Sequence, residues 1–520
     1  MGYLFDRAVA REPEKVALYQ DDRTLTYGEL DRRANRVADA LRSLGVARGQ
    51  RVALLFDNHI AYIESCFGVF RLGAVAVPVN PRLADDSVAH ILGHSDAAVL
   101  ICSPNQSARA ARLVERAPQV GVLVCWVERL TGGRTARSAG GIQVIDYEPW
   151  IARAGEAPLD VPIADDAIAF QPYTSGSTGV PKGCLLTHGG QRWNVGAVVS
   201  ARGYARSDRA LVAAPLSHKN AMVSGIKPML YVGGSVVLLA QFEPEAYVRA
   251  IERYRPTCTT GVPAIYNMIF ARPELFERYD VSSIRFCCIG SAGVSPEIAR
   301  NVDRFFNHAA ISESYGSTEG GPVTLVQPRD HRAGLLPVAG TELAILRTDG
   351  SPCAAGETGE LRVRNPGVIV SYYKDPAASE SGLEGRWYRT RDLARRGDDG
   401  RYLIVGRADD MIITGGENVF PKEVEDVLRR HPSVADVAVV ALEHAVKGEV
   451  PVAFVVAREP PAPQLEERLK RHVLEHAPAF AHPRRIWFLD ELPLSSAGKI
   501  DRRTLHSMAA DLAASSSTRV

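Results

Sequence analysis

Apolar and polar residues follow two rhythms in the first part of the chain. Residues 27–44 place apolar side chains at nearly helical spacing, directly after two short strand-like stretches at 16–19 and 23–26. Short apolar runs of strand character then alternate with helical segments, and these runs occupy 51–56, 74–78, 97–101 and 120–127. Because strands that alternate with helices usually form parallel sheets covered by helices, the pattern predicts an α/β fold.

The rhythm changes further along the chain. A second α/β rhythm covers 209–310, and short strands with glycine turns at 338–370 predict a small β-rich subdomain. A break follows near 406–410. Beyond it, helices and strands are expected for an independent α+β domain, at 421–430, 434–442, 451–457, 464–476 and 485–489. Segment 131–141 is expected to be a surface loop with little order, and the tail from Ala509 is expected to be frayed.

Composition excludes several classes of protein. A chain of 520 residues exceeds the size of a single hydrophobic core, so at least two domains are expected. Lys and Arg number 61 against 60 Asp and Glu, so no basic excess would attract nucleic acid. The first 15 residues carry charges throughout, and no long apolar run follows. We therefore expect a cytoplasmic protein without a membrane span or a nucleic-acid partner, either a monomer or a homodimer.

The cysteines do not form a metal-binding pattern. None of the eight belongs to a CxxC pair, and the adjacent Cys287 and Cys288 fall in an expected strand. Successive residues of a strand point to opposite faces, so these two thiols cannot bind one ion together. We expect reduced thiols buried in the core.

The segment YTSGSTGVPKG at 173–183 carries the strongest chemical signal. Its glycines let backbone N–H groups crowd around an anion, its hydroxyls donate further hydrogen bonds, and Lys182 adds positive charge. A polyphosphate clamp needs this combination, although the spacing differs from that of a Walker A loop. Glycine, serine and threonine content alone would favour a flexible surface loop.

Several strings of the chain together resemble the signature of the adenylate-forming superfamily, which includes acyl-CoA and aryl-CoA ligases, peptide-synthetase adenylation domains and beetle luciferases. The phosphate-loop string is the most specific of them. The others follow in the family's order over nearly the whole chain: LTYGELDRRANRVADAL at 25–41, APLSHKNAM at 214–222, IGSAGVSPE at 289–297, SESYGSTEGG at 312–321, WYRTRDLARRGDDGRYLIVGRADDMI at 387–412 and PLSSAGKIDRR at 493–503.

This resemblance implies a site for ATP and Mg²⁺. Glu319 would hold the metal, and Thr318 would bond the α-phosphate. Asp392 would accept the ribose hydroxyls, with Arg407 beside it. The remaining implied residues form the phosphate loop, at Thr174, Ser175, Gly176, Ser177, Thr178, Gly179 and Lys182, and flank the adenine, at Ser291, Ala292, Glu313, Ser314 and Tyr315.

The resemblance also implies a second step on a small domain that moves. Lys499 would bridge the carboxylate and the α-phosphate during adenylate formation, and so count as catalytic. Asp409 matches the family's hinge, and rotation there would bring Gly415 and Gly416 to the coenzyme A tunnel. The implied architecture is a large N-terminal adenylating domain at 1–406, with helix-covered sheets and the β-rich subdomain, a hinge at 407–410, and a mobile α+β lid domain at 411–520.

The acyl pocket is expected around His218, a catalytic candidate that would gate the carboxylate. The resemblance assigns to this pocket His218, Lys219, Asn220, Met222 and Gly290. No carboxylate lies at 215–220, which disfavours an α-amino acid. Lys219 and Asn220 make the stretch polar, which favours a short, polar or aromatic acid, and both residues would equally suit a turn that faces water.

Two positions depart from the family pattern. Arg391 stands where the family often has glycine, so the backbone beside Asp392 would differ. Ala481 stands where lysine is common, which weakens the assignment of contacts to the phosphates of coenzyme A.

The expected activity is that of an AMP-forming acid–CoA ligase with ATP, Mg²⁺ and coenzyme A as cofactors. It would form an acyl-adenylate with release of pyrophosphate, and then a thioester with release of AMP. One alternative is a stand-alone enzyme that loads an acyl group onto a carrier-protein phosphopantetheine. Others are an oxidative luciferase-like enzyme and an inactive adenylate-sensing module. The last is disfavoured because Lys182, Glu319, Asp392, Arg407 and Lys499 are all present.

Overall fold

The computed structural model describes residues 1–129, 142–175, 180–290, 293–307, 309–327, 334–444, 446–462, 464–494 and 500–517. The expected loop at 131–141 therefore lies outside the described residues, as do Gly176 to Gly179, Ser291, Ala292 and Lys499. The chain divides by compactness into a first unit, Met1–Glu342 with Val363–Arg389, and a second unit, Leu343–Arg362 with Thr390–Val520. This division falls elsewhere than the boundary predicted near 406–410, and the hinge stays a prediction.

A mainly parallel sheet carries the second half of the first unit. Its strands run in the order β18-β17-β16-β15-β14-β12-β13-β1-β2. Strands β1, β13, β12, β14, β15 and β16 are parallel to their neighbours in this series, while β2 and β17 are antiparallel additions. The strands are β1 (Val16–Gln20), β2 (Arg23–Thr26), β12 (Arg209–Val212), β13 (Ser235–Leu238), β14 (Cys258–Gly261), β15 (Phe286–Gly290), β16 (Ala310–Tyr315), β17 (Leu325–Val326) and β18 (Leu336–Pro337).

A second mainly parallel sheet carries the first half of this unit, in the order β11-β8-β4-β3-β5-β6-β7. The strands predicted at 51–56, 74–78, 97–101 and 120–127 are β3, β4, β5 and β6, so these predictions are confirmed. The strands of this sheet, and of the separate hairpin β9-β10, are β3 (Arg51–Leu55), β4 (Val75–Val79), β5 (Ala97–Cys102), β6 (Val122–Cys125), β7 (Gln143–Asp146), β8 (Ile168–Phe170), β11 (Leu186–Thr187), β9 (Tyr173–Ser175) and β10 (Pro181–Gly183).

Helices cover these sheets, as the predicted α/β fold requires. Helix α2 begins at a capping box, in which Thr26 and Glu29 satisfy each other's backbone N–H groups. The helices and helical turns of the first unit are α1 (Asp6–Arg11), α2 (Tyr27–Ser43), α3 (Ile60–Arg71), α4 (Asp85–His94), η1 (Pro104–Gln106), α5 (Ser107–Val114), η2 (Val127–Arg129), α6 (Tyr147–Ala152), α7 (His188–Arg202), η3 (Ala221–Ile226), α8 (Lys227–Val232), α9 (Pro244–Tyr254), α10 (Pro263–Phe270), α11 (Glu274–Arg278), α12 (Pro296–Phe305) and α13 (Pro376–Gly382).

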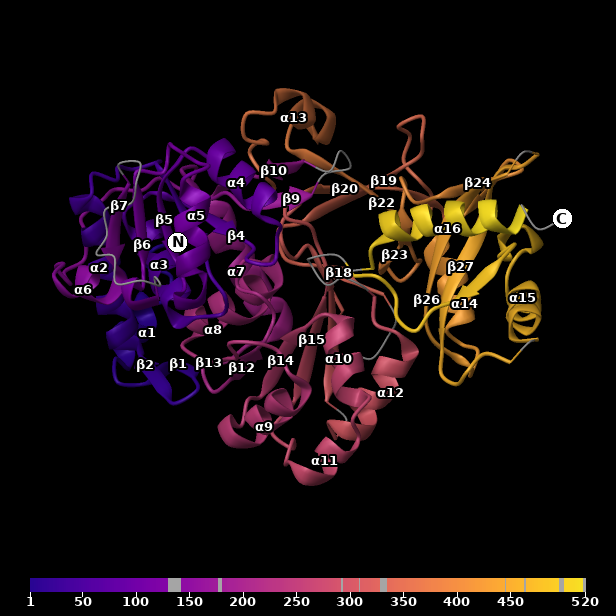
Figure 1. Cartoon of the computed structure of the whole chain (residues 1–520), viewed down its shortest axis with the longest axis horizontal. Helices are drawn as coiled ribbons and strands as arrows, with labels where there is room; N and C mark the ends of the chain where they lie inside the picture. The colour runs from indigo at the N-terminus through magenta and orange to yellow at the C-terminus, as the bar shows by residue number, and fades with distance from the viewer. Residues whose placement is uncertain are drawn as a thin grey trace. The chain divides into compact units, whose positions relative to one another are not determined.

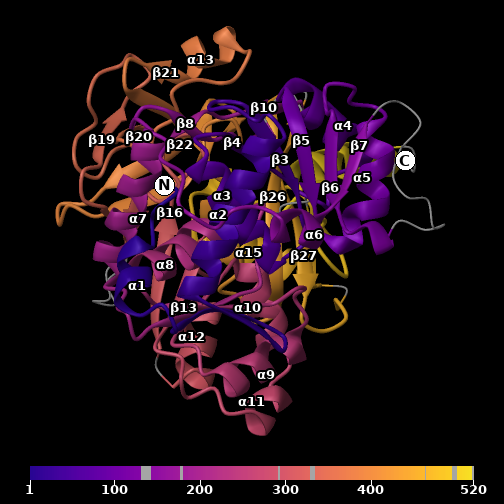
Figure 2. The same cartoon turned by 90° about the vertical axis from the view of Figure 1, so that its left-hand side faces the viewer.

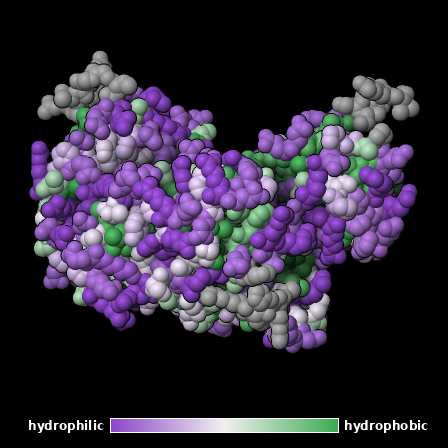
Figure 3. Space-filling model, turned by 90° about the horizontal axis from the view of Figure 1, so that it is seen from below, coloured by the Kyte–Doolittle hydropathy of each residue, from purple (hydrophilic) through white to green (hydrophobic). Residues whose placement is uncertain are grey.

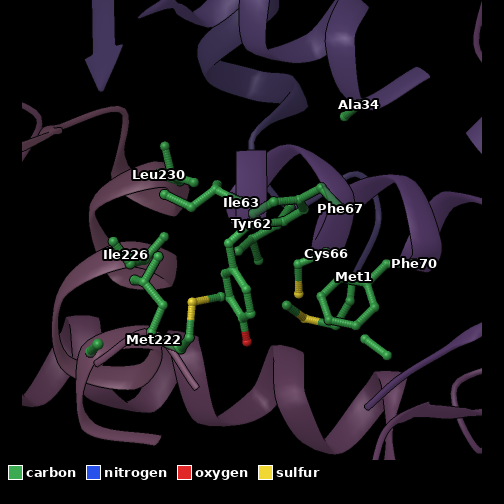
Figure 4. Packing of buried hydrophobic residues seen from close by; sticks show 14 of the residues in the cluster. Met1, Ala34, Tyr62, Ile63, Cys66, Phe67, Phe70, Met222, Ile226 and Leu230 are labelled. Carbon is green, nitrogen blue, oxygen red and sulfur yellow. The ribbon is translucent and has the colours of Figure 1, made fainter. Parts of the chain in front are cut away.

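The largest core cluster joins both sheets through buried helices. It contains apolar residues of α2, α3, α7 and α8 together with residues from strands of either sheet, and every residue of α3 is buried. Figure 4 shows part of this cluster, where Tyr62 of α3 lies beside Met222 and Cys66 points toward Met1. Strands buried on both faces explain why the sequence has near-continuous apolar runs.

Further clusters cover the outer faces of the sheets. Helices α9, α10, α11 and α12 lie together in both views (Figure 1; Figure 2) and pack on one face of the first sheet. Cys287 belongs to this cluster and Cys288 to the largest core cluster, so the two thiols do point to opposite faces. All eight cysteines are free.

Strands cross the boundary between the units in the predicted β-rich region. They are β19 (Glu342–Leu346), β20 (Thr358–Arg364) and β22 (Trp387–Arg396), and β21 (Leu383–Glu384) lies within the first unit. In the second unit, the end of β22 pairs with β23 (Tyr402–Arg407), and Asp392 lies opposite Arg407 in the register.

The rest of the second unit is an α+β domain, as predicted. Its sheet has the order β25-β24-β27-β26, with β28 beside β27. Helices α14 and α15 cover one face of this sheet, and α16 covers the other. The elements are β24 (Ile412–Thr414), β25 (Glu417–Val419), α14 (Pro421–Leu428), β26 (Val434–His444), β27 (Gly448–Ala457), α15 (Leu465–His476), η4 (Ala479–Ala481), β28 (Ile486–Phe488) and α16 (Arg502–Ser517).

The predicted fraying of the tail from Ala509 is wrong for most of its length. Helix α16 continues to Ser517, and Ala509 is fully buried beside Leu505 against β26 and β27. Packing of this apolar stripe on the sheet, rather than intrinsic helix propensity, stabilises the helix.

Hydrophilic residues dominate the face of the molecule in Figure 3, and hydrophobic residues form only small groups among them. Within the described ranges, no helix combines the length and the apolarity that a membrane span needs.

Candidate active site

The predicted site residues of the first unit gather at the carboxyl ends of parallel strands. The segment with His218 follows β12, Gly290 ends β15, and Tyr315 ends β16. Because β12, β14, β15 and β16 are parallel neighbours, their carboxyl ends lie along one edge of the sheet. Ligands of α/β sheets bind at this edge, so three distant motifs converge there.

The described part of the phosphate loop is an antiparallel hairpin. Thr174 in β9 lies opposite Lys182 in β10, and Ser175 ends β9 before the undescribed Gly176, Ser177, Thr178 and Gly179. Lys182 Nζ lies 3.2 Å from Asp375 Oδ2, so its charge is held at the base of the hairpin.

Thr174 connects this hairpin to the proposed metal ligand. Its Oγ1 donates a 2.8 Å hydrogen bond to Glu319 Oε1 across 145 residues of sequence. Cys184 lies behind the pair, and burial raises the pKa of its thiol, with a further contribution from the Glu319 carboxylate. The phosphate-loop motif and the Tyr-Gly-x-Thr-Glu motif are therefore joined by a direct side-chain contact.

The turn that carries Thr318 and Glu319 is tightly constrained. A Cβ at Gly316 would lie 2.4 Å from the carbonyl oxygen of Pro322, so only glycine fits there. Within the turn, Ser317 Oγ accepts from the backbone N–H of Gly320 at 2.7 Å. The backbone N–H of Ile369 bonds the Glu319 carbonyl at 2.9 Å. Thr318 and Glu319 are partly buried within this turn, as a role at a phosphate requires.

Residues of β16 divide between two faces. Glu313 and Tyr315 share one face of the strand and Ser314 points to the other, because strand side chains alternate. Ser314 was predicted beside the adenine with its two neighbours. Ser314 lines a small cavity together with Lys219, Asn220 and Gly290, and its place beside the adenine stays a prediction.

That cavity has a volume of about 20 Å³ and contains most of the predicted acyl pocket. Lys219 Nζ donates to the carbonyl oxygen of Gly316, which ties the two motifs together. His218 and Met222 do not line the cavity. Met222 is 2% exposed and lies beside Tyr62 in the core (Figure 4), so its predicted place in the pocket is not seen here.

His218 lies at the turn between β12 and the helical segment. Its backbone N–H bonds the carbonyl oxygen of Pro215 at 3.0 Å, and its Nδ1 accepts from the backbone N–H of Asn220 at 3.4 Å. These two bonds restrain His218 within the turn in the middle of the APLSHKNAM motif. Its role as a gate for the carboxylate stays a prediction.

The predicted ribose and hinge residues form a charge cluster within the second unit. Arg407 Nη1 lies 3.1 Å from Asp392 Oδ1, and Arg407 Nη2 lies 3.4 Å from Asp409 Oδ2. Arg391 Nη1 lies 3.9 Å from the same Asp409 oxygen. Asp392 and Arg407 are therefore paired with each other, and their role at the ribose stays a prediction.

The backbone conformation at Arg391 explains why the family often has glycine at this position. Its φ is +57°, in the left-handed region that glycine adopts without strain. Gly415 and Gly416 also have positive φ, at +61° and +92°, and no atom within 4 Å faces their Cβ positions. Both glycines are thus required by their turn and leave open space beside the backbone.

Two residues of the site were not predicted. Asp375, the partner of Lys182, caps helix α13 and accepts from the backbone N–H of Ala378, a role that the Asp-Pro dipeptide at 375–376 could have indicated. Arg202 is 1% exposed and donates to Ser314 Oγ at 3.1 Å. No local signal marks that contact, since the partner lies 112 residues away.

The fold and these motifs define an enzyme that binds AMP. A model of the AMP-binding enzyme family matches residues 5–373, and a model of the AMP-binding enzyme C-terminal domain matches 423–499. The chain therefore belongs to the AMP-binding enzyme family, as its motifs predicted.

Relatives of the chain are named as CoA ligases. It is 36% identical over 501 residues to a feruloyl-CoA synthase of Amycolatopsis sp, covering 95% of this chain and 96% of that one. It is 34% identical to an indoleacetate–CoA ligase of Aromatoleum aromaticum, covering 97% of both chains. The solved structure of the anthranilate CoA ligase AuaEII with anthranoyl-AMP superposes with a TM-score of 0.91 at 27% identity, over 99% of this chain and 98% of that one. The prediction of an acid–thiol ligase is confirmed at the level of enzyme class.

Proposed function

We propose that the chain is an ATP-dependent acid–CoA ligase. The carboxylate of the acid attacks the α-phosphorus of ATP, and the bond to pyrophosphate breaks. The thiol of coenzyme A then attacks the acyl carbon of the adenylate, loses its proton, and displaces AMP. Both steps bring negatively charged groups together, so the protein must position them and neutralise charge.

The hydrogen bond between Thr174 and Glu319 is the observation that carries this proposal. It joins a loop rich in glycine and hydroxyl groups to a carboxylate at the carboxyl edge of a parallel sheet. A triphosphate chain in the loop and its metal at Glu319 would then be adjacent. Thr318, one residue before Glu319, would bond the α-phosphate in the same turn.

The donor set at Glu319 fits Mg²⁺. This hard cation prefers oxygen ligands and is commonly held by one or two carboxylates together with substrate phosphates. In the described part of the chain, Glu319 belongs to no group of three or more His, Cys, Asp or Glu side chains that could hold an ion by themselves. Glu319 would therefore hold the metal with phosphate oxygens of ATP, and the bound ion would offset charge on the leaving pyrophosphate.

Residues of the second unit would complete each step. The Asp392 carboxylate would accept the ribose hydroxyls, held in place by Arg407 at 3.1 Å. Lys499, outside the described residues, would bridge the carboxylate and α-phosphate in the first step. The open space at Gly415 and Gly416 would let pantetheine lie against the backbone in the second.

Release of AMP and of pyrophosphate from a panel of acids tests the proposal directly. The panel begins with ferulate, indole-3-acetate and anthranilate, the acids to which the relatives' names refer, and extends to short and polar acids. Each acid is assayed with ATP and Mg²⁺, with and without coenzyme A. We expect pyrophosphate exchange with an accepted acid alone, and steady AMP release only when coenzyme A is added.

Other results would redirect the assignment. AMP release that responds to a phosphopantetheinylated carrier protein but not to coenzyme A would favour the carrier-loading enzyme. Steady AMP release with every acid in the absence of any thiol would contradict a ligase.

A further inference from the structure

A buried arginine stands behind the cavity of the predicted acyl pocket. Arg202 ends helix α7 and is 1% exposed. Its Nη2 donates to Ser314 Oγ at 3.1 Å, and its Nη1 donates to the hydroxyl of Tyr204 at 3.3 Å. A guanidinium can only donate hydrogen bonds. The Ser314 oxygen is therefore the acceptor in this contact, and its own hydrogen is left to donate elsewhere.

Asn220, on the same cavity, is also oriented as a donor. Its Oδ1 accepts from Thr260 Oγ1 at 2.7 Å, and its Nδ2 donates to the carbonyl oxygen of Gly261 at 3.4 Å. A carbonyl oxygen can only accept, which fixes the amide in this orientation. One N–H of the Asn220 amide remains after these bonds.

Three backbone carbonyl oxygens of the residues that line the cavity already accept hydrogen bonds. Gly316 O accepts from Lys219 Nζ, and Val323 O accepts from Asn194 Nδ2 at 2.9 Å. The carbonyl oxygen of Ser224 accepts from the Tyr204 hydroxyl at 2.8 Å. The side chains oriented by this network thus offer hydrogens to the cavity, and a buried cation lies behind them.

Gly290 separates the two donors without filling the space. A Cβ at Gly290 would lie 3.1 Å from Ser314 Oγ and 3.2 Å from Asn220 Nδ2. Both donors therefore border the backbone of Gly290, and any side chain at this position would crowd them.

We propose that the acid carries a second hydrogen-bond acceptor, an oxygen or nitrogen remote from the reacting carboxylate, which Ser314 Oγ and Asn220 Nδ2 bind together. Arg202 is a positioning residue, since it holds the Ser314 hydroxyl as a donor. The inference rests on the proposed function, which puts the acyl group in this cavity. A purely apolar acid would leave the Ser314 hydroxyl and the remaining N–H of Asn220 without an acceptor on the acid, at a cost in affinity.

The size of the cavity limits this part of the acid. A volume of about 20 Å³ holds little more than one water-sized group. The part of the acid that enters the cavity is therefore a small group, such as a carbonyl or a ring nitrogen.

Acids that differ by a single acceptor test the proposal. Pyridine-3-carboxylate replaces one CH of benzoate by nitrogen, and 3-oxobutanoate replaces the methylene of 3-methylbut-3-enoate by oxygen. AMP release with coenzyme A yields kcat/KM for each acid. For at least one pair, we expect the wild type to prefer the acceptor-bearing acid by roughly tenfold or more.

Variants separate the network from general damage. Ser314→Ala removes one of the two donors and should clearly lower the preference within each pair. Arg202→Met should lower the preference in the same way, and Arg202→Lys, which keeps a donor, should restore part of it. A buried arginine can be needed for folding. If Arg202→Met does not fold, the result with Ser314→Ala alone tests the proposal. Arg192→Met removes a cation from the same helix, where Arg192 pairs with Asp165 at 2.8 Å on the surface, and should leave the preference unchanged.

Two results would overturn the inference while the ligase function stands. One is a wild-type enzyme that activates the panel but prefers the apolar member of every pair. The other is a preference that Ser314→Ala leaves intact. If no acid releases AMP at all, the proposed function fails and this inference fails with it.

Discussion

Glu319 and Thr174 make separable contributions, because one supplies charge and the other orients it. Glu319→Gln keeps the shape and can still meet Thr174, whose Oγ1 lies 2.8 Å from Glu319 Oε1, but removes the negative charge. We expect ATP–pyrophosphate exchange to fall on the order of 100-fold, with a higher Mg²⁺ requirement. Thr174→Val keeps the carboxylate and should cost less, about tenfold. ATP–pyrophosphate exchange rates measured over a range of Mg²⁺ concentrations distinguish the effects of the two variants. An unchanged rate in Glu319→Gln would show that Glu319 does not bind the metal.

Arg391 has a left-handed backbone with φ of +57°, which strains any residue other than glycine or asparagine. Arg391→Gly relieves the strain and Arg391→Ala retains it. Both variants lose the 3.9 Å ion pair with Asp409, which is half-exposed and contributes little. We therefore expect Arg391→Gly to be more stable than Arg391→Ala by about 1 kcal/mol in urea unfolding. Equal stabilities would mean that the turn relaxes in solution.

Lys227 predicts a dependence of stability on pH. It is 1% exposed, donates to Gln191 Oε1 at 2.7 Å, and burial lowers the pKa of its ammonium group to about 8. The unfolded chain keeps this proton up to about pH 10.4. Between these values the unfolded state binds more protons, so stability should rise with pH, by about 3 kcal/mol over the whole window.

Lys227→Met is the matched comparison. It leaves Gln191 without its donor at every pH, a constant offset, and removes only the titration. Burial raises the pKa of Cys66, in the same core cluster, to about 12, so its thiol stays protonated in the folded protein over this window. Its titration in the unfolded chain is common to wild type and Lys227→Met and cancels in the comparison. We expect the stability of wild type relative to Lys227→Met to increase from pH 8 to pH 10. A difference that stays flat with pH would contradict the buried charge.

Helix α16 shows how an element depends on its packing. Ala509 is fully buried against the sheet of the second unit, whereas the next residue, Ala510, is exposed. Ala509→Gln would overpack the interface and bury an amide, and we expect a loss of about 2 kcal/mol in the protection of α16 amides from hydrogen exchange. Ala510→Gln has the same helix propensity change and should stay within about 0.5 kcal/mol. Similar losses in both variants would indicate that α16 is held by propensity alone.

Burial also decides which helices and strands could be predicted from the sequence. Strands β3 to β6 were predictable because they are buried on both faces and therefore continuously apolar. The end of α16 was not, because its buried stripe beyond Leu505 uses a small residue, Ala509, within a segment rich in alanine and serine. Small side chains carry little hydrophobic signal, so only the facing sheet reveals that they are buried.

At the scale of the whole molecule, the motifs predicted which residues share a site, and the parallel sheet explains why they do. Ser314 and Gly290 are neighbours because β15 and β16 pair in register. The partners that hold these residues were not predictable, since Arg202 of helix α7 and Asp375 at the start of α13 are far from Ser314 and Lys182 in the sequence. Such contacts depend on the fold as a whole and leave no local pattern in the sequence.

Domain alternation is the prediction that belongs to the whole chain. Asp409 is the expected hinge, and its carboxylate lies 3.4 Å from Arg407 Nη2. Asp409→Pro fixes φ and should leave pyrophosphate exchange nearly intact while lowering thioester formation by about tenfold or more, because only the second step needs the rotation. Asp409→Asn removes the charge and keeps the backbone free, so it separates loss of the ion pair from loss of rotation and should retain both steps. The two half-reactions are measured separately, by pyrophosphate exchange and by thioester formation from supplied acyl-adenylate. Equal losses of both in Asp409→Pro would show that the chain does not turn at this residue.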